Sequence, residues 1–248
     1  MPYRKSFFIL FTPRSGSTWL RSLCENTGRL GSPAEHFAPT RVDRMRSYQR
    51  IEDLPAHISM LFDRQRQNPV FSFKITMGQM ADTFGDETTF ARAFGPIPCV
   101  FLIRRDMVLR AVSSYRKRVS STGHSFAKND GGEAAKAKAV DYRPVQIRNF
   151  LLRGVETERR AYNFLQKLNA PAVRLSYEGV SQNPEDALNR ILGLLHEPPL
   201  SAFEDPGKVE VMRNELSYEY AEQFRREHPN LVRKLTAERR DILDSLEI

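Results

Sequence analysis

Four short strand-like segments, separated by helix-like sequence, constrain the fold of this chain more than any other feature. Ser6–Phe11 (SFFILF) is a continuous apolar run, which is typical of a central parallel strand covered on both faces. Three later segments are also strand-like: Val70–Ile75, Pro98–Ile103 and Ala172–Ser176. Because helical patterns stand between these segments, we predict an α/β fold with a central, mostly parallel sheet flanked by helices.

The length of the chain fits one large domain or two small ones, since it has 248 residues. No change of composition marks a boundary, so we expect a single domain over residues 1–248. The segment Ser120–Pro144 is polar and contains Gly123, Gly131 and Gly132. Long polar loops often carry function, and we predict a mobile loop here that covers a site.

Composition places the chain among ordinary globular proteins. Hydrophobic residues make up 40% and charged residues 27%, which excludes a disordered or fibrous chain. No apolar run approaches the roughly 18 residues that a membrane span needs. The N-terminal sequence also lacks the pattern of a secretory signal peptide. We therefore expect a cytoplasmic enzyme with no integral membrane association.

The cysteines and histidines do not indicate a metal site. Cys24 and Cys99 each stand in an apolar pattern, so we predict two buried free thiols rather than a disulfide framework. The five histidines show no ligand spacing with one another or with the cysteines. We expect no metal cofactor.

The segment FTPRSGSTWL, which follows the first predicted strand, indicates an anion-binding site. A turn between a strand and a helix directs several unpaired backbone N–H groups and the positive end of the helix dipole at one point. Gly16 permits a close backbone approach, while Ser15, Ser17 and Thr18 add hydroxyl donors. Arg14 adds a fixed positive charge. One N-cap serine would suffice for an ordinary helix start, so this loop has more donors than a structural role needs.

A second basic segment follows the strand Pro98–Ile103. Arg104 and Arg105 emerge from the carboxyl end of this strand, and Ser113 lies in the helix that follows. Ligands of open α/β sheets bind outside the carboxyl ends of the strands. We therefore expect Arg14 and one of Arg104 or Arg105 to hold a ligand that carries two separated anionic groups.

Two other classes of protein compete with this interpretation. A P-loop kinase or NTPase would carry G-x-x-x-x-G-K-[ST], but Ser17 follows Gly16 and the lysine is absent; a kinase of atypical sequence remains an alternative. The formal net charge of +8 is compatible with a nucleic-acid-binding protein. However, the C-terminal arginines alternate with acids, which is typical of a solvated helix face, and no nucleic-acid motif is present. We expect no nucleic-acid partner.

The combination of TPRSGSTWL with a later strand–Arg–helix–Ser element resembles the sulfotransferases that use 3′-phosphoadenosine 5′-phosphosulfate (PAPS), and more closely the bacterial Stf0 family. The resemblance implies a fold like that of P-loop NTPases. It also implies that the loop from Arg14 to Thr18 holds the 5′-phosphosulfate. The 3′-phosphate would be held by Ser113 with Arg104 or Arg105; the Stf0 spacing of nine residues before the serine favours Arg104.

The resemblance also implies catalytic residues. Gly31–Phe37 (GSPAEHF) is similar to a Pro-x-Glu-Phe-Phe stretch of the family whose glutamate is the general base, and that glutamate matches Glu35. His36 stands where the family has phenylalanine and is an alternative base. Lys74 matches a strand-end lysine that approaches the transferred group. The expected reaction is in-line transfer of a sulfuryl group from PAPS to a hydroxyl of a carbohydrate or glycolipid-type acceptor, without a metal, by a homodimer.

Overall fold

The computed structural model describes most of the chain, namely residues 5–38, 53–123, 140–203 and 215–248. Contacts between Cα atoms divide the chain into two compact units, which we describe separately. The first unit comprises Met1–Arg105, Thr157–Glu210 and Ile242–Ile248, and the second comprises Asp106–Glu156 and Val211–Asp241. This division does not decide the number of domains, so the single domain expected over residues 1–248 stays a prediction.

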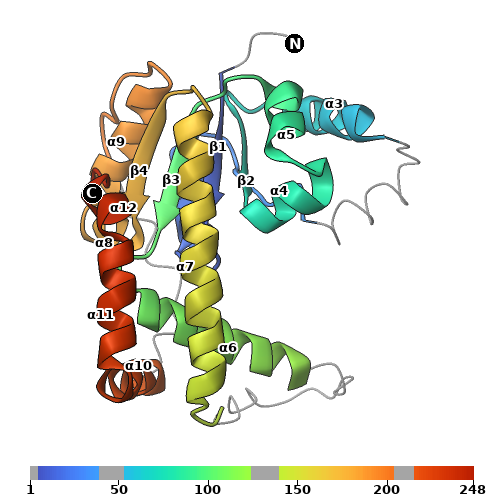
Figure 1. Cartoon of the computed structure of the whole chain (residues 1–248). Helices are drawn as coiled ribbons and strands as arrows, with labels where there is room; N and C mark the ends of the chain where they lie inside the picture. The colour runs from blue at the N-terminus through green and yellow to red at the C-terminus, as the bar shows by residue number, and fades with distance from the viewer. Residues whose placement is uncertain (1–4, 39–52, 124–139, 204–214) are drawn as a thin grey trace, which may run out of the picture. The chain divides into compact units, whose positions relative to one another are not determined.

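The first unit contains a four-stranded parallel sheet. Its strands are β1 (Ser6–Phe11), β2 (Phe71–Ile75), β3 (Cys99–Ile103) and β4 (Ala172–Ser176), in the order β2-β1-β3-β4 (Figure 1). All four predicted strands are confirmed, with ends that agree to within one residue. The chain passes from β1 outward to β2 on one side and later to β3 and β4 on the other. The strand order therefore reverses between β1 and β3, where open α/β sheets bind their ligands.

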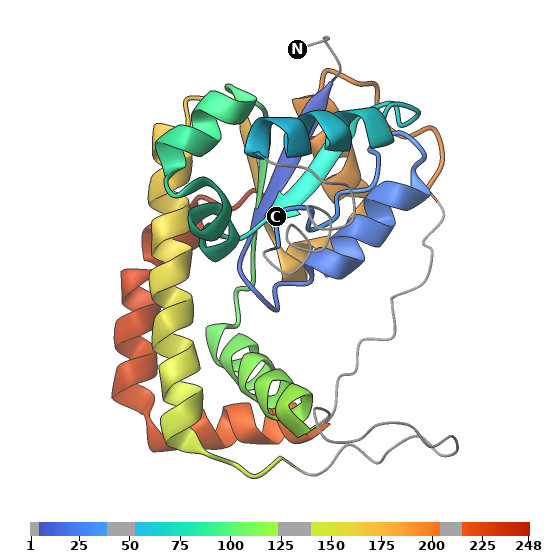
Figure 2. The same ribbon diagram turned by 90° about the vertical axis from the view of Figure 1, so that its right-hand side faces the viewer.

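Helices cover both faces of this sheet, as predicted, because successive strand residues point to opposite faces. Phe8, Leu10 and Phe73 belong to the core on one face, and Phe7 and Ile9 to the core on the other. The first core is covered by α3 (Leu54–Arg64), α4 (Met77–Phe84), α5 (Glu87–Phe94), the C-terminal half of α7 (Pro144–Lys167) and α12 (Arg240–Asp244). The second is covered by α1 (Ser17–Asn26), α8 (Tyr177–Gln182) and α9 (Pro184–Leu194). In Figure 2 the blue helix α1 and the green helix α5 lie on opposite sides of the strands.

The second unit is helical. It contains α6 (Met107–Gly123), the N-terminal half of α7, α10 (Glu215–Glu227) and α11 (Pro229–Glu238). Val112, Ile147 and Phe224 are fully buried in its core. The start of the predicted loop at Ser120 is wrong, because α6 continues through Gly123. Residues 124–139 of that loop lie outside the described residues.

The environments of the cysteines and of the C-terminal arginines test two further predictions. Cys24 and Cys99 are free and fully buried, as predicted. Arg225 pairs with Asp106, at 2.6 Å, and with Glu222. The solvated face predicted for the arginines is wrong for Arg239, whose exposed fraction is only 1%. No helix in the described part of the chain has both the length and the apolar character needed to cross a bilayer.

Candidate active site

The loop between β1 and α1, which the sequence predicts to bind an anion, makes a tight turn. The Ser15 N–H donates to the Thr12 carbonyl at 3.2 Å, which closes a turn. Arg14 and Gly16 adopt positive φ angles of 69° and 81°. Gly16 is the N-cap of α1 and has no side chain to accept from the first-turn N–H groups. These N–H groups therefore face the end of the loop, where the helix dipole favours an anion.

The close approach of Tyr177 explains why position 16 is glycine. A Cβ atom at Gly16 would lie 2.3 Å from Cδ2 of the Tyr177 ring. Tyr177 follows β4, and its ring also packs edge-on against Trp19, with centroids 6.2 Å apart. The guanidinium carbon of Arg104 lies 5.0 Å from the same ring centroid. Tyr177 thus contacts both the loop after β1 and the arginine after β3.

Two hydroxyl groups of the loop are buried without a hydrogen-bond partner among the described residues. These are Thr12 Oγ1 and Ser15 Oγ, and both residues are fully buried. An unsatisfied buried polar atom costs about 1–3 kcal/mol. The loop therefore contains donors that an anionic ligand with several acceptor oxygens would satisfy, which fits the residues to the predicted phosphosulfate.

Arg14 and Arg104 come from the ends of β1 and β3, on either side of the strand-order reversal. Partial burial and the positive charge of Arg104 together lower the pKa of Arg14. Glu178 Oε1 lies 3.8 Å from Arg104 Nε, a long ion pair. Two cations thus come from neighbouring strand ends at the carboxyl edge of the sheet, and their role in binding stays a prediction.

Arg105 has a different environment from Arg104. Its backbone N–H donates to Glu178 Oε2 at 2.8 Å, and its Nε donates to Ser176 Oγ at 3.0 Å. Ser176 is the N-cap of α8 and accepts from the Gly179 N–H. Arg105 is thus hydrogen-bonded to two residues at the start of α8. Ser113 lies in the second turn of α6, in the other unit, and its role at the 3′-phosphate stays a prediction.

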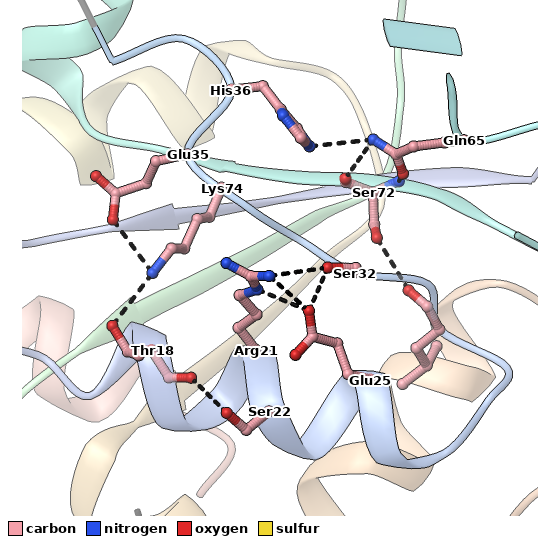
Figure 3. Close-up of polar contacts among 11 residues, drawn as sticks. Thr18, Arg21, Ser22, Glu25, Ser32, Glu35, His36, Gln65, Ser72 and Lys74 are labelled. Atoms are coloured by element: carbon pink, nitrogen blue, oxygen red, sulfur yellow. Dashed lines mark hydrogen bonds and ion pairs between the residues drawn. The ribbon is translucent and has the colours of Figure 1, made fainter. Parts of the chain in front are cut away.

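Lys74 connects the start of α1, after the predicted anion-binding loop, to the segment that contains Glu35 (Figure 3). Its Nζ donates to Ser17 Oγ at 3.2 Å and Thr18 Oγ1 at 3.4 Å, and lies 3.2 Å from Glu35 Oε1. Only 4% of the Lys74 side chain is exposed, and its Nζ lies 5.2 Å from the centroid of the Phe11 ring. A buried cation needs such partners. The structure thus brings Lys74, Ser17, Thr18 and Glu35 together.

Glu35 is fixed in two ways, through the backbone of the residue before it and through contacts of its own carboxylate. The preceding residue, Ala34, pairs with β2, where the Lys74 N–H donates to the Ala34 carbonyl at 3.0 Å. Glu35 Oε2 accepts from Gln79 Nε2 at 2.8 Å, and 38% of the side chain remains exposed. Sequence reasoning missed Gln79. The sequence could have indicated a structural role for Gln79, because the spacing of Thr76 and Gln79 matches a capping box, which the structure shows at the start of α4.

His36 points away from Lys74 and toward Gln65 (Figure 3). Gln65 Oε1 accepts from the Ser72 N–H, so its Nε2 is the donor that meets His36 Nε2 at 3.2 Å. His36 Nε2 therefore acts as an acceptor within the fold and is not directed at the cations. Glu35 and His36, the two alternative bases, lie on different sides of the chain segment that contains them.

A further polar cluster lies on α1 beside Lys74 and was not predicted. Arg21 donates to Glu25 Oε1 at 2.8 Å and to Ser32 Oγ at 3.2 Å, and Ser32 donates to Glu25 (Figure 3). Burial raises the pKa of Glu25, but the hydrogen bonds from Ser32 and Arg21 outweigh it and lower the pKa overall, with a smaller contribution from Lys74. Within the described ranges, no group of three His, Cys, Asp or Glu residues gathers as metal ligands would.

Comparisons with known proteins identify the family and the fold of the chain. Residues 64–227 match the family described as Stf0 sulphotransferase. The fold is similar to the sulfotransferase domain from the curacin biosynthetic pathway, with 15% identity, a TM-score of 0.51, and coverage of 92% of this chain and 98% of that chain. A sulfotransferase from Alicyclobacillus acidocaldarius is also similar, with 17% identity, a TM-score of 0.50, and coverage of 94% and 96%. No curated protein matches the sequence.

The family match includes β2 with Lys74, β3 with the two arginines, and α6 with Ser113. It begins after the anion-binding loop and after Glu35, so the evidence for these residues is their geometry. The low identities to the solved structures establish the fold alone. Since the family match spans well over half of the 248 residues, the chain belongs to the Stf0 sulphotransferase family and is a sulfotransferase, as the sequence predicted.

Proposed function

We propose that this sulfotransferase moves a sulfuryl group from PAPS to a hydroxyl of a carbohydrate or glycolipid-type acceptor, with Glu35 as the general base. The observation that carries the proposal is the position of Lys74. Its ammonium group contacts the hydroxyls of Ser17 and Thr18 at the start of α1 and also the Glu35 carboxylate. One cation thus adjoins both the predicted donor site and the predicted base.

The charges of the site suit the donor. PAPS carries roughly four negative charges, counting about −2 for a phosphomonoester. The first-turn N–H groups of α1, the Arg14 guanidinium and the buried Ser15 hydroxyl would bind its 5′-phosphosulfate. Arg104, whose charge acts on Arg14, would contribute a second cation for the anionic donor.

The chemical step is an in-line displacement at sulfur. The acceptor hydroxyl oxygen forms a bond to sulfur while the bond from sulfur to the 5′-phosphate oxygen breaks, which releases adenosine 3′,5′-bisphosphate. Glu35 takes the hydroxyl proton, and general base catalysis of this kind typically contributes 10²–10⁴-fold. The other product is a sulfate ester.

Lys74 and the loop act mainly through charge. Negative charge accumulates on the leaving phosphate as the bond to sulfur breaks, and oriented donors in a buried site stabilise it. Lys74 is the most buried of the cationic groups here, so its charge is the least screened by water. Its contact with Glu35 also holds the carboxylate beside the predicted donor site.

The test is an assay of PAPS turnover over a panel of hydroxyl compounds. The panel contains free sugars, glycolipids, aliphatic alcohols and phenols, and mass spectrometry detects both adenosine 3′,5′-bisphosphate and the sulfated product. We expect turnover with a sugar-containing acceptor and a loss of 10²-fold or more in Glu35→Gln. Asp63→Asn is the control, because Asp63 is an exposed acid that pairs with Arg66 outside the site. Sulfation of phenols alone, or full activity of Glu35→Gln, would contradict the proposal.

A further inference from the structure

The side-chain amide of Gln79 has its two ends engaged by different parts of the structure. Gln79 Oε1 accepts from the Thr76 N–H at 3.0 Å, and the Gln79 N–H donates to Thr76 Oγ1 at 3.1 Å. These two bonds form the capping box of α4. At the other end of the amide, Nε2 donates to Glu35 Oε2 at 2.8 Å. Gln79 thus joins the start of a helix to the proposed base.

The capping box determines which end of the amide meets Glu35. A backbone N–H can only donate, so the group that faces Thr76 must be the amide oxygen. The amide nitrogen, which can only donate, is therefore the group that faces the carboxylate. Reversing the amide would place two donors together at Thr76 and two acceptors together at Glu35.

This orientation restricts the position of Glu35. The carboxylate is held at one oxygen by Gln79 and at the other by Lys74, 3.2 Å away. A donor that bonds to a carboxylate stabilises its charged form. Each carboxylate oxygen has a second lone pair, and the side chain is 38% exposed, so it can still accept from a substrate hydroxyl.

We propose that Gln79 is a positioning residue that fixes the Glu35 carboxylate through its amide donor. This inference rests on the proposed role of Glu35 as base. It adds to that role a residue outside the anion-binding loop, which acts only through Glu35. Gln79 can fulfil this function because its oxygen is already used by the helix cap.

Gln79→Glu separates the two functions of the residue. Glutamate is also a capping-box residue, so one of its oxygens can still accept from the Thr76 N–H. Its other oxygen would replace the donor with a negative charge facing Glu35. Two adjacent carboxylates cannot both ionise easily, so one of the two pKa values must rise. Thr76→Ala is the matched control, because it removes the hydroxyl of the cap and leaves the amide donor of Gln79 in place.

The first measurement is the titration of the Glu35 carboxyl carbon by ¹³C NMR, which needs no acceptor substrate; Glu35→Gln assigns the signal. We expect Gln79→Ala, which removes the donor without adding a charge, to move this titration up, and Thr76→Ala to leave it in place. In Gln79→Glu the two neighbouring carboxyls titrate as a pair, and at least one of their two steps should lie above the wild-type step. Unchanged titration in Gln79→Ala, or an equal shift in Thr76→Ala, would overturn the role of Gln79.

The second measurement is the pH dependence of kcat with PAPS and an acceptor found in the panel. We expect the acidic limb of the profile to move up with the titration in Gln79→Ala, while PAPS affinity measured by calorimetry stays within two-fold. Glu35→Gln is assayed alongside these variants. If it keeps full kcat, the proposed base is wrong and this proposal falls with it. If it is inactive while the limb of Gln79→Ala does not move, the base stands and the positioning role of Gln79 is wrong.

Discussion

The guanidinium of Arg104 repels that of Arg14 across the carboxyl ends of β1 and β3. Together with partial burial, this repulsion lowers the pKa of Arg14. Like charges that act on each other in this way raise the free energy of the unliganded protein. A polyanion bound between them removes that penalty. The relationship therefore predicts how the stability of the protein responds to nucleotide.

Adenosine 3′,5′-bisphosphate is expected to raise the melting temperature of the protein. A ligand at 100 times its Kd adds about 2.7 kcal/mol to the free energy of unfolding, and 1 kcal/mol corresponds to about 2–4 °C for a chain of 150–250 residues. We expect Arg14→Ala to lose most of this shift, without a lower melting temperature in the absence of ligand, because it also removes the repulsion. Differential scanning fluorimetry at several nucleotide concentrations measures both.

Arg66→Ala is the control for loss of general positive charge. Arg66 is an exposed arginine that pairs with Asp63, three residues away, at 2.7 Å. The nucleotide should stabilise this variant as much as the wild type. An equal loss of stabilisation in Arg66→Ala and Arg14→Ala would show that net charge, and not a defined site, binds the nucleotide.

The different partners of Arg104 and Arg105 predict opposite results for their alanine variants. Arg105→Ala breaks the bond to Ser176 Oγ, and a hydrogen bond of this kind contributes about 0.5–1.5 kcal/mol. This variant should melt at a lower temperature but keep the shift with adenosine 3′,5′-bisphosphate. Arg104→Ala should lose much of that shift. The reverse result would assign the nucleotide to Arg105.

His36→Phe should retain turnover. His36 Nε2 accepts from Gln65, which also donates to the Ser72 carbonyl at 3.3 Å, so Gln65 keeps a partner after the substitution. Steady-state kinetics with the acceptor from the panel should give a kcat within a few-fold of the wild type, whereas Glu35→Gln should fall by 10²-fold or more. A loss in His36→Phe comparable to that in Glu35→Gln would transfer the role of base to His36.

The sheet was predictable because its strands are signalled by short-range sequence alone. Ser6–Phe11 is almost entirely apolar, and the structure buries it on both faces. The helices α4 and α5 were missed, although Thr76 and Asp86 cap them through side-chain hydrogen bonds. Each has eight residues, too few for a clear apolar periodicity, and most helical stability comes from packing that the sequence does not display.

The sequence predicted which candidate site residues lie at the carboxyl edge of the sheet, because the direction of the strands determines this. It did not predict side-chain contacts between residues that are distant in sequence. A loop after a parallel strand must lie at the carboxyl edge of the sheet, so Arg14, Lys74 and Arg104 were placed there from sequence. The contact of Gln79 with Glu35 joins positions 44 residues apart, and no local pattern encodes it. The separation of Arg104 from Arg105 likewise follows from Ser176, which is distant in sequence.

The approach of Tyr177 to Gly16 predicts a large difference between two glycine substitutions at the ends of α1. Gly16 and Gly28 both have positive φ angles, 81° and 62°, but a Cβ atom at Gly28 would have no atom within 4 Å. Alanine in the left-handed region costs about 1–2 kcal/mol at either position. Gly28→Ala should therefore lower the melting temperature by a few degrees, and Gly16→Ala by clearly more, because its Cβ also meets the ring.

A double-mutant cycle tests whether the contact between position 16 and the Tyr177 ring causes the extra cost of Gly16→Ala over Gly28→Ala. Tyr177→Ala removes the ring that the new Cβ would meet, at the cost of the packing against Trp19. Gly16→Ala should then cost less in the Tyr177→Ala background than in the wild type, by 0.5–3 kcal/mol as found for residues in direct contact, measured by urea denaturation. Additive costs would mean that the ring moves aside without penalty. The glycine would then be required by its backbone conformation alone, as Gly28 is, and not by the ring that also contacts Arg104.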